Sequence, residues 1–148
     1  MNSYLDSGQV LVALAGDQIL GHLQLTETDR PGEIEIKNMA VLPCHRHRGI
    51  GRALIVAAVE LAREQSRSTM RVATAAADID NLRFYQRAVF RMRSIERDAF
   101  TAADGYDPAT KVDGIELVGR VWLDRKVDAP DTLKGRAPTL ESEQANFE

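Results

Sequence analysis

A strand, a basic turn with two glycines and a helix follow one another between residues 33 and 65. The segment Glu33–Val41 (EIEIKNMAV) alternates charged and apolar residues and becomes wholly apolar at its end. This pattern predicts a strand that is partly exposed at its start and buried at its finish. After Gly49-Ile50-Gly51, apolar residues recur at helical spacing and predict a helix from about Arg52 to Gln65. The sequence therefore predicts a strand–turn–helix unit in the first half of the chain.

Further strands and one further helix are predicted on both sides of this unit. The apolar runs Gln9–Ala15 and Ile19–Thr26 flank Gly16, a residue that tolerates positive φ, and predict a hairpin. The remaining predicted elements are a strand at Met70–Ala75, a short helix at Asn81–Ala88 and strands at Met92–Arg97 and Ile115–Leu123. The order β-β-β-α-β-α-β-β predicts a mixed α/β (α+β) fold.

The length and composition favour one domain followed by a tail. A chain of 148 residues with 44% hydrophobic residues is long enough to bury one continuous core. We predict that this domain spans residues 1–127. The segment 128–148 contains Pro130, Pro138 and scattered glutamates but few large apolar residues, so it buries too little surface to offset its ordering entropy. It is predicted to be a flexible acidic tail.

Charge and cysteine content argue against several classes of partner. The formal net charge is -3, with both signs interspersed, which disfavours nucleic acid as a partner. No apolar stretch approaches the roughly 20 residues of a membrane span, so no membrane partner is expected. Cys44 is the single cysteine and cannot form an internal disulfide. We expect a cytoplasmic protein.

The turn between strand and helix has the chemistry of an anion site. Its glycines let backbone N–H groups approach an anion at the positive end of the helix, which predicts a pyrophosphate cradle. A Walker A loop would need Lys-Ser/Thr after Gly51, and a dinucleotide fingerprint would need a third glycine where Leu54 stands. The alternative is a solvated turn that only caps a helix, and residue types alone leave both interpretations open.

The motif Arg46-x-x-Gly49-x-Gly51 resembles the signature turn of the GNAT superfamily of N-acetyltransferases, as do the preceding Val41-x-Pro43 and the following Ala53-Leu54. The resemblance runs from Tyr4 to about Val127. It implies the GNAT-like acyl-CoA N-acyltransferase fold, a mixed and mostly antiparallel sheet flanked by helices. It also implies that an acetyl group passes directly from acetyl-CoA, as cosubstrate, to a primary amine within a ternary complex.

The resemblance further implies which residues bind coenzyme A. Backbone amides of the turn would hold the pyrophosphate, and the end of the preceding strand would pair with the pantetheine arm and present the thioester. Asn81 matches a residue that commonly hydrogen-bonds the pantetheine. The implied cofactor-binding residues are Met39, Ala40, Val41, Arg46, His47, Arg48, Gly49, Ile50, Gly51, Arg52, Ala53 and Asn81.

Aminolysis of a thioester needs a deprotonated amine, a polarised carbonyl and an acid for the leaving thiolate. Tyr85 matches the tyrosine that the family places near the thioester sulfur as general acid. Glu35 falls where some members carry a strand glutamate that deprotonates the amine, usually through water. The alternatives are that Tyr85 is a core aromatic and Glu35 an exposed strand charge. Glu33 is a weaker base candidate on the same face, and Asn38 could hydrogen-bond substrate or backbone.

Other reactive side chains are assigned lesser roles. Cys44 lies in the turn without a nearby carboxylate to orient a histidine, which disfavours covalent catalysis. His22, His45 and His47 lack the spacing of a zinc site, so no metal is expected.

The acceptor is expected to be a small amine. A loop that often borders the acceptor in relatives holds the specificity candidates Asp98, Phe100, Tyr106 and Asp107. Together with Glu33 and Glu35, Asp98 favours a cationic acceptor such as an aminoglycoside or a polyamine. A peptide or protein N-acetyltransferase and a non-catalytic acyl-CoA-binding domain are the alternative functions.

Two features depart from the family pattern. Only about eight residues precede the first predicted strand, so we expect the usual first strand and N-terminal helices to be absent or shortened. A homodimer is then expected, in which the neighbouring chain covers apolar surface beside the first strand. Val89 stands where many relatives carry glycine, and because β-branched residues resist positive φ, a remodelled helix end is expected there.

Overall fold

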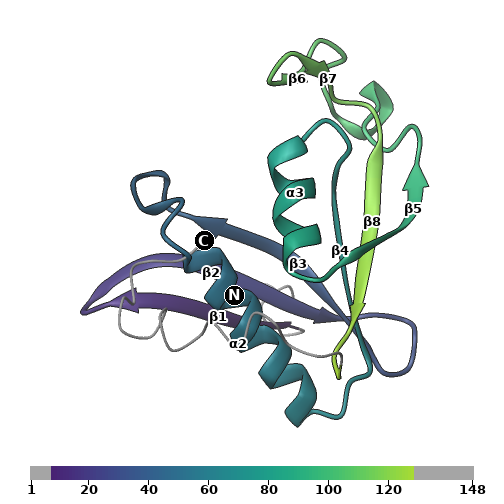
Figure 1. The fold of residues 1–148 in the computed structure, drawn as a ribbon. Coiled ribbons are helices and arrows are strands. Elements are labelled where there is room, and N and C mark those ends of the chain that lie inside the picture. Colours follow the sequence, from purple (N-terminus) through teal and green to yellow (C-terminus); the bar gives the residue numbers. More distant parts are fainter. Residues whose placement is uncertain (1–7, 129–148) are drawn as a thin grey trace. The chain divides into compact units, whose positions relative to one another are not determined.

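The computed structural model describes residues 8–128, which divide into two compact units. The first contains residues 8–70 and 126–128, and the second contains residues 71–125 (Figure 1). Residues 1–7 and the segment 129–148, which covers nearly all of the predicted tail, lie outside the described residues.

The first unit contains an antiparallel meander of three strands, β1 (Gly8–Ala15), β2 (Gln18–Glu27) and β3 (Glu33–Val41). They pair in the order β1-β2-β3. The predicted hairpin is confirmed, since Ala15 pairs with Gln18 around Gly16, whose φ is 62°. The three predicted strands therefore exist at the expected places.

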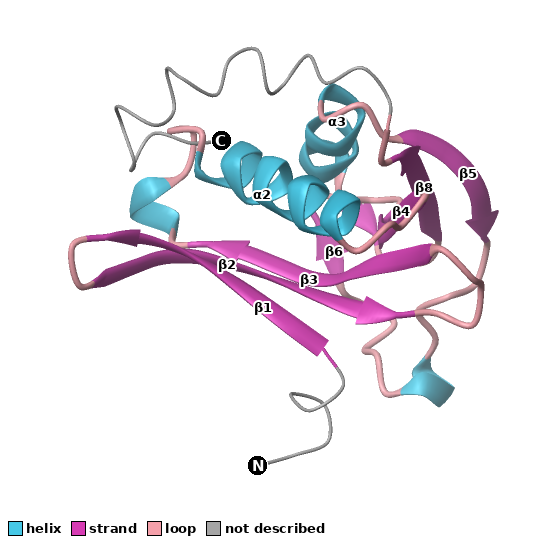
Figure 2. Ribbon diagram, turned by 90° about the horizontal axis from the view of Figure 1, so that it is seen from below, coloured by secondary structure: helices cyan, strands magenta, loops and turns pink. Residues whose placement is uncertain are grey.

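Helix α2 (Ile50–Glu64) packs on one face of this meander, and a short 3-10 helix, η1 (Pro43–His45), precedes it (Figure 2). A Cβ atom added to Gly21 would lie 3.3 Å from Cγ2 of Ile50, so Gly21, and with it Leu23 and Leu25, faces the helix. The core of this unit is apolar and fully or almost fully buried: Leu20, Leu23, Leu25, Ile34, Ile36, Ile50, Leu54, Ile55, Ala58, Val59 and Ala62.

A β-bulge in β3 changes which side chains share a face. Gln24 pairs with Asn38, but Leu25 pairs with Ile36, which leaves Lys37 as the extra residue. Asn38 therefore lies on the face of β2 that carries Gln24, opposite to the face that α2 covers.

The burial of β3 differs from the prediction. Glu33 is only 4% exposed and Ile34 is buried, whereas Ala40 near the other end is exposed. The expected order of exposed start and buried finish is wrong. The cause is that Ile34 and Ile36 enter the core beside Leu25, while the apolar end of the strand runs toward the turn.

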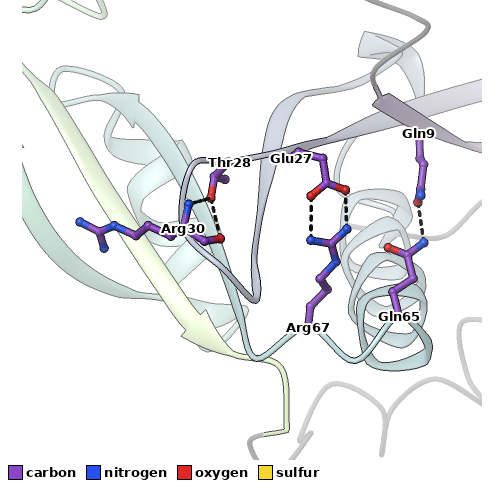
Figure 3. A network of polar contacts seen from close by, with 6 residues as sticks. All are labelled: Gln9, Glu27, Thr28, Arg30, Gln65 and Arg67. Atoms are coloured by element: carbon purple, nitrogen blue, oxygen red, sulfur yellow. Dashed lines mark hydrogen bonds and ion pairs between the residues drawn. The ribbon is translucent and has the colours of Figure 1, made fainter.

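Side-chain contacts attach the end of α2 to the strands. Arg67 forms a two-pronged ion pair with Glu27, with one nitrogen–oxygen distance of 2.8 Å. Nε2 of Gln65 donates to Oε1 of Gln9 over 3.0 Å (Figure 3). These contacts join segments that lie 40 and 56 residues apart in the sequence.

The second unit combines a small sheet with one helix. Its strands pair in the order β4-β8-β5, β5 and β8 are antiparallel, and α3 contacts β5. Its elements are β4 (Thr69–Ala75, whose first two residues belong to the first unit), α3 (Ile79–Arg87), β5 (Arg91–Glu96), η2 (Ala102–Asp104), β6 (Lys111–Val112), β7 (Ile115–Glu116) and β8 (Arg120–Lys126, whose last residue belongs to the first unit).

The predicted strand Ile115–Leu123 is wrong at its start. Residues 115–116 pair back onto residues 111–112 as the short hairpin β6–β7. Asp113 and Gly114, with φ of 48° and 84°, form the two-residue turn that this pairing needs. The long strand, β8, begins only at Arg120.

The expectation of a remodelled helix end at Val89 is also wrong. Val89 adopts a φ of 76°, the conformation for which glycine is the usual residue. Hydrogen bonds hold it there: the N–H of Phe90 donates to the carbonyl oxygen of Tyr85 over 3.0 Å, and the N–H of Val89 to that of Gln86 over 3.1 Å. These two bonds form a Schellman motif, which closes α3 in the ordinary way around a β-branched residue.

Candidate active site

The turn before α2 places the start of the helix at a glycine. Gly49 is the N-cap residue, with φ 84° and ψ 7°, and no side chain forms a capping hydrogen bond. The first turn of the helix contains no acidic residue. Since the first N–H groups of a helix carry partial positive charge and lack intrahelical acceptors, this end is suited to an anion.

Basic side chains surround this helix end. Nε of Arg46 donates to the carbonyl oxygen of Val41 over 3.4 Å, which links the turn to the end of β3. Nη1 of Arg48 lies 3.0 Å from Nδ1 of His45. His47 has a φ of 64°, a conformation that the sequence analysis did not foresee, although histidine is among the residues enriched there. Arg46, His47 and Arg48 are all exposed, so their charges are accessible to a diphosphate.

The end of β3 lies directly beside β2. Met39 pairs with Leu23, Ala40 with His22 and Val41 with Gly21. A Cβ atom on Gly21 would lie 2.8 Å from the carbonyl oxygen of Ala40, so only glycine permits this close approach. Sequence reasoning missed Gly21, although glycine inside a strand is a signal of close backbone approach.

The predicted base, Glu35, lies on the same face of the sheet as Asn38. It pairs with Thr26 and is half-buried. Glu33, the weaker candidate two residues earlier, is buried. Both carboxylates therefore lie in the first unit, on the face that α2 leaves uncovered.

Asn38 lies at the centre of a chain of polar side chains on that face. Its Nδ2 donates to Oε1 of Gln24 over 2.8 Å, and its Oδ1 lies 3.1 Å from Nε2 of His22. Gln24 is 2% exposed. Sequence reasoning missed His22 and Gln24, although polar residues at every second position of β2 were a usable signal.

The predicted general acid, Tyr85, lies in the second unit and is 5% exposed. Its ring centroid lies 5.1 Å from that of Phe84 and 5.6 Å from that of Phe90, in edge-to-face geometry. Burial, and next the negative charge of Asp78, raise the pKa of the Tyr85 hydroxyl. Tyr85 is thus a packed aromatic that also keeps its proton at neutral pH.

Asn81 lies in the first turn of the same helix. Its backbone N–H donates to Oδ1 of Asp78, the N-cap residue of α3, over 3.0 Å. Its Nδ2 donates to Oγ1 of Thr74 over 3.3 Å. These contacts fix the Asn81 side chain beside β4.

Of the four specificity candidates, the two aromatic residues contact each other, whereas no such contact is seen for the two aspartates within residues 8–128. The rings of Phe100 and Tyr106 meet edge to face at 4.9 Å, and the Arg120 guanidinium lies 4.9 Å from the Phe100 ring centre. Asp98 is exposed, and Oδ1 of Asp107 accepts from the N–H of Ala109 over 2.9 Å. Asp107 therefore supports the loop itself.

Within residues 8–128, no group of three or more His, Cys, Asp and Glu side chains is arranged to hold a metal ion. No helix in this part of the chain is long and apolar enough to cross a membrane. Cys44 is exposed and free.

Solved structures of similar proteins share this architecture. An acetyltransferase from Bacillus subtilis, solved in complex with CoA, has a TM-score of 0.77 and 32% identity, over 84% of this chain and 80% of that one. A GNAT family acetyltransferase from Elizabethkingia anophelis, solved with acetyl-CoA bound, has a TM-score of 0.76 and 27% identity, over 84% of this chain and 79% of that one. The fold is therefore the mixed, mostly antiparallel GNAT fold.

Sequence comparison leads to the same family. The chain is 32% identical over 126 residues to an uncharacterised N-acetyltransferase of Bacillus subtilis (strain 168), YvbK. The aligned residues make up 84% of this chain and 79% of the relative. Residues 2–90 match the model of the acetyltransferase (GNAT) family. Because this match spans more than half of the chain and includes the glycine turn, the chain belongs to the acetyltransferase (GNAT) family.

Proposed function

We propose that this protein is an N-acetyltransferase that moves the acetyl group of acetyl-CoA to a primary amine by direct transfer in a ternary complex. The main support for the proposal is the suitability of the start of α2 for binding an anion. Its N-cap residue, Gly49, provides no side-chain cap, its first turn contains no acidic residue, and three exposed basic residues precede it. Relatives with 32% and 27% identity hold CoA and acetyl-CoA.

Each part of acetyl-CoA has a proposed place. The diphosphate would bind at residues 46–53, where backbone N–H groups and positive charge meet. The end of β3, Met39–Val41, would pair with the pantetheine arm, and Asn81 would hydrogen-bond it. The thioester would then lie at this end of β3.

The chemical step forms one bond and breaks another. The amine nitrogen attacks the thioester carbon, a C–N bond forms, the C–S bond breaks, and coenzyme A leaves as a thiolate that takes up a proton. Tyr85 is the proposed donor of that proton, because it matches the tyrosine that the family places near the thioester sulfur. Glu35 remains a candidate for receiving a proton from the amine through water.

The acceptor is proposed to be a small cationic amine. Glu35 is half-buried on the face of the meander that α2 leaves uncovered, and its negative charge there favours a positively charged substrate, whereas Glu33 on the same face is buried. The formal net charge of -3 gives no support to nucleic acid as the acceptor. The exposed free thiol of Cys44 suits the reducing cytoplasm, the proposed location.

A homodimer is proposed because one face of β1 and β2 exposes large apolar side chains. Val10, Val12, Leu14 and Ile19 are 47%, 46%, 47% and 54% exposed, and register pairs Leu14 with Ile19 on that face. A second copy that covers these side chains would lower their exposure and, because Val12 pairs with His22, would border the polar side chains of the same face. Light scattering across a dilution series tests this, and a monomer with full turnover would contradict it.

A thiol-release assay with acetyl-CoA and a panel of amines tests the function. We expect polyamines and aminoglycosides to release free coenzyme A, and acidic amines to release none. Thermal shift with coenzyme A measures binding independently, since a ligand stabilises by RT ln(1 + [L]/Kd). Binding without thiol release from any amine or peptide would instead indicate a non-catalytic acyl-CoA-binding domain.

A further inference from the structure

We infer that His22 removes the proton from the acceptor amine, and that Asn38 and Gln24 hold its imidazole in the tautomer which this role requires. The inference deepens the proposed acetyl transfer and rests on it. It assigns a role to a histidine that has no part in the glycine turn.

The hydrogen-bond chain determines the tautomer. Asn38 donates through Nδ2 to Oε1 of Gln24 over 2.8 Å, so its Oδ1 faces the imidazole of His22, 3.1 Å from Nε2. An amide oxygen only accepts hydrogen bonds, and therefore Nε2 must carry the hydrogen. In a neutral imidazole the lone pair then resides on Nδ1, which can accept a proton.

The buried end of this chain makes the arrangement rigid. Gln24 is 2% exposed, and it pairs directly with Asn38 in the β2–β3 register. A buried amide that lost its partner would be costly, because its desolvated polar atoms would stay unpaired. The orientation of Asn38 is thus held from inside the sheet, and the half-buried His22 lies at the accessible end.

His22 lies beside the segment proposed to present the thioester. It pairs with Ala40, the central residue of Met39–Val41, and side chains of directly opposed residues share a face at about 5 Å between Cβ atoms. On β1 its opposite residue is Val12, which has no polar group. Among the described residues of β1, β2 and β3, His22 is therefore the titratable residue directly opposite this part of β3 on its face.

Glu35 lies farther than His22 from the Met39–Val41 end of β3. It pairs with Thr26, four residues along β2 from His22, which corresponds to about 13 Å at the usual rise per residue. Among the described residues of the meander, the charged groups on this face are Glu33 and Glu35, with Lys37 exposed at the bulge, and β1 contributes the apolar side chains of Val10, Val12 and Leu14. The half-buried carboxylate of Glu35 suits attraction of a cationic amine, and the imidazole of His22 suits removal of its proton.

The proposed reaction removes two protons from the acceptor ammonium ion. The amine arrives as an ammonium ion, and Nδ1 of His22 takes one proton, leaving a neutral amine and an imidazolium. The amine nitrogen attacks the thioester carbon, the C–S bond breaks, and the second amine proton ends on the released thiol. The imidazolium then returns its proton to water.

The first experiment determines the tautomer of His22, and its result does not depend on enzymatic activity. Nitrogen-15 NMR of the imidazoles in the full chain should show His22 with its hydrogen on Nε2, and Asn38→Leu should remove that preference. A wild-type protein with the hydrogen on Nδ1 would overturn the inference.

Kinetics provide the second measurement. His22→Gln should lower the rate of acetyl transfer roughly 10²- to 10⁴-fold, the usual contribution of a general base, without weakening coenzyme A binding. Thr26→Val, on the same strand and face, should retain the wild-type rate. A full rate in His22→Gln together with a comparable loss in Glu35→Gln would overturn the inference in favour of the carboxylate.

A third variant keeps the histidine and therefore remains informative if His22→Gln folds poorly. In Asn38→Asp the introduced carboxylate stabilises the imidazolium, so the acidic limb of the rate–pH profile should move about one unit toward higher pH. An unmoved limb would overturn the role of His22. Failure of the proposed function itself would be seen in the thiol-release assay. If the wild type released no thiol with any amine, both proposals would be overturned.

Discussion

The guanidinium of Arg125 donates a hydrogen bond through Nη1 to the backbone carbonyl oxygen of Ala88 over 3.2 Å, and so joins β8 to the end of α3. The two residues lie 37 positions apart, and Arg125 is buried. Helix ends leave carbonyl groups that need such partners.

Arg125→Met tests this contact, because it keeps a long buried side chain but removes the donor. A buried carbonyl without its partner costs about 1–3 kcal/mol, so the free energy of unfolding should fall by that amount in urea titrations. Arg91→Met, at an exposed position at the start of β5, is the control and should change little. Equal stabilities of the two variants would contradict a role for Arg125 at the helix end.

Val89→Gly should stabilise the protein. A left-handed conformation costs an L-residue roughly 1–2 kcal/mol, whereas glycine adopts it freely and loses about 0.5–1 kcal/mol in backbone entropy. At a φ of 76° the relief of the left-handed conformation should exceed the loss of backbone entropy, and Tm should rise by up to about 4 °C. Val118→Gly, an exposed valine without positive φ, should not raise Tm. A fall in Tm for Val89→Gly would show that the valine side chain matters more than its backbone.

Tyr85→Phe tests the proposed acid, since it deletes one hydroxyl and keeps the ring that packs against Phe84 and Phe90. If Tyr85 protonates the leaving thiolate, the acetyl-transfer step should slow by roughly 10²- to 10⁴-fold, with little change in coenzyme A affinity. Because water can protonate a thiolate, the step itself should be followed before steady state. An unchanged rate there would leave Tyr85 as a core residue only.

The same variant predicts a stability difference at high pH. The raised pKa of the Tyr85 hydroxyl means that the folded protein holds this proton more tightly than the unfolded chain, in which tyrosine titrates near 10. This contribution is complete below pH 10 and is lost as the pH rises above it. Wild type should therefore lose stability relative to Tyr85→Phe above pH 10, as thermal melts at pH 8 and pH 11 can show.

Valine at Gly49 or Gly51 should weaken coenzyme A binding, because a Cβ atom would hinder the approach of a diphosphate to the helix start. We expect at least a roughly tenfold rise in Kd by calorimetry, about 1.4 kcal/mol. Gly49→Val should also lower stability, since its φ is 84°. Gly16→Asn, in the hairpin turn, is the control for a glycine change away from the site and should leave Kd unaltered. Unchanged affinity in both turn variants would refute the phosphate site.

The ion pair between Glu27 and Arg67 predicts pH-dependent stability. The hydrogen bond from Arg67 lowers the pKa of the Glu27 carboxyl below its ordinary value of 4.5. The pair therefore stabilises the fold above pH 4.5, and this contribution is lost as the pH falls through the lowered value. Since Glu27 is largely exposed, we expect only roughly 0.2–1 kcal/mol. Melts of Glu27→Gln and wild type should differ at pH 7 and coincide near pH 3, and a difference that persisted at pH 3 would contradict the assignment.

Local patterns were sufficient to predict most elements. Apolar runs around Gly16 predicted β1, β2 and the hairpin between them, alternation predicted β3, and helical spacing predicted α2. The turn that contains Gly49 and Gly51 was visible too, because a glycine-rich strand-to-helix turn is a local feature. In each case, the determining interactions lie within a few residues of one another.

Other features depended on neighbours that are distant in the sequence. The sheet register brings the side chain of His22 within hydrogen-bond distance of Asn38, 16 positions away in the sequence, and the bulge at Lys37 places Asn38 on the face of Gln24. Similarly, the Schellman hydrogen bonds and Arg125 hold the end of α3 around Val89, against the local preference of a β-branched residue. The strands, the helices and the glycine turn follow from local sequence patterns, because the interactions that cause them are local. Strand register determines which polar side chains meet on the face that α2 leaves uncovered, and long-range hydrogen bonds determine that Val89 is tolerated at positive φ, so neither could be predicted from local patterns.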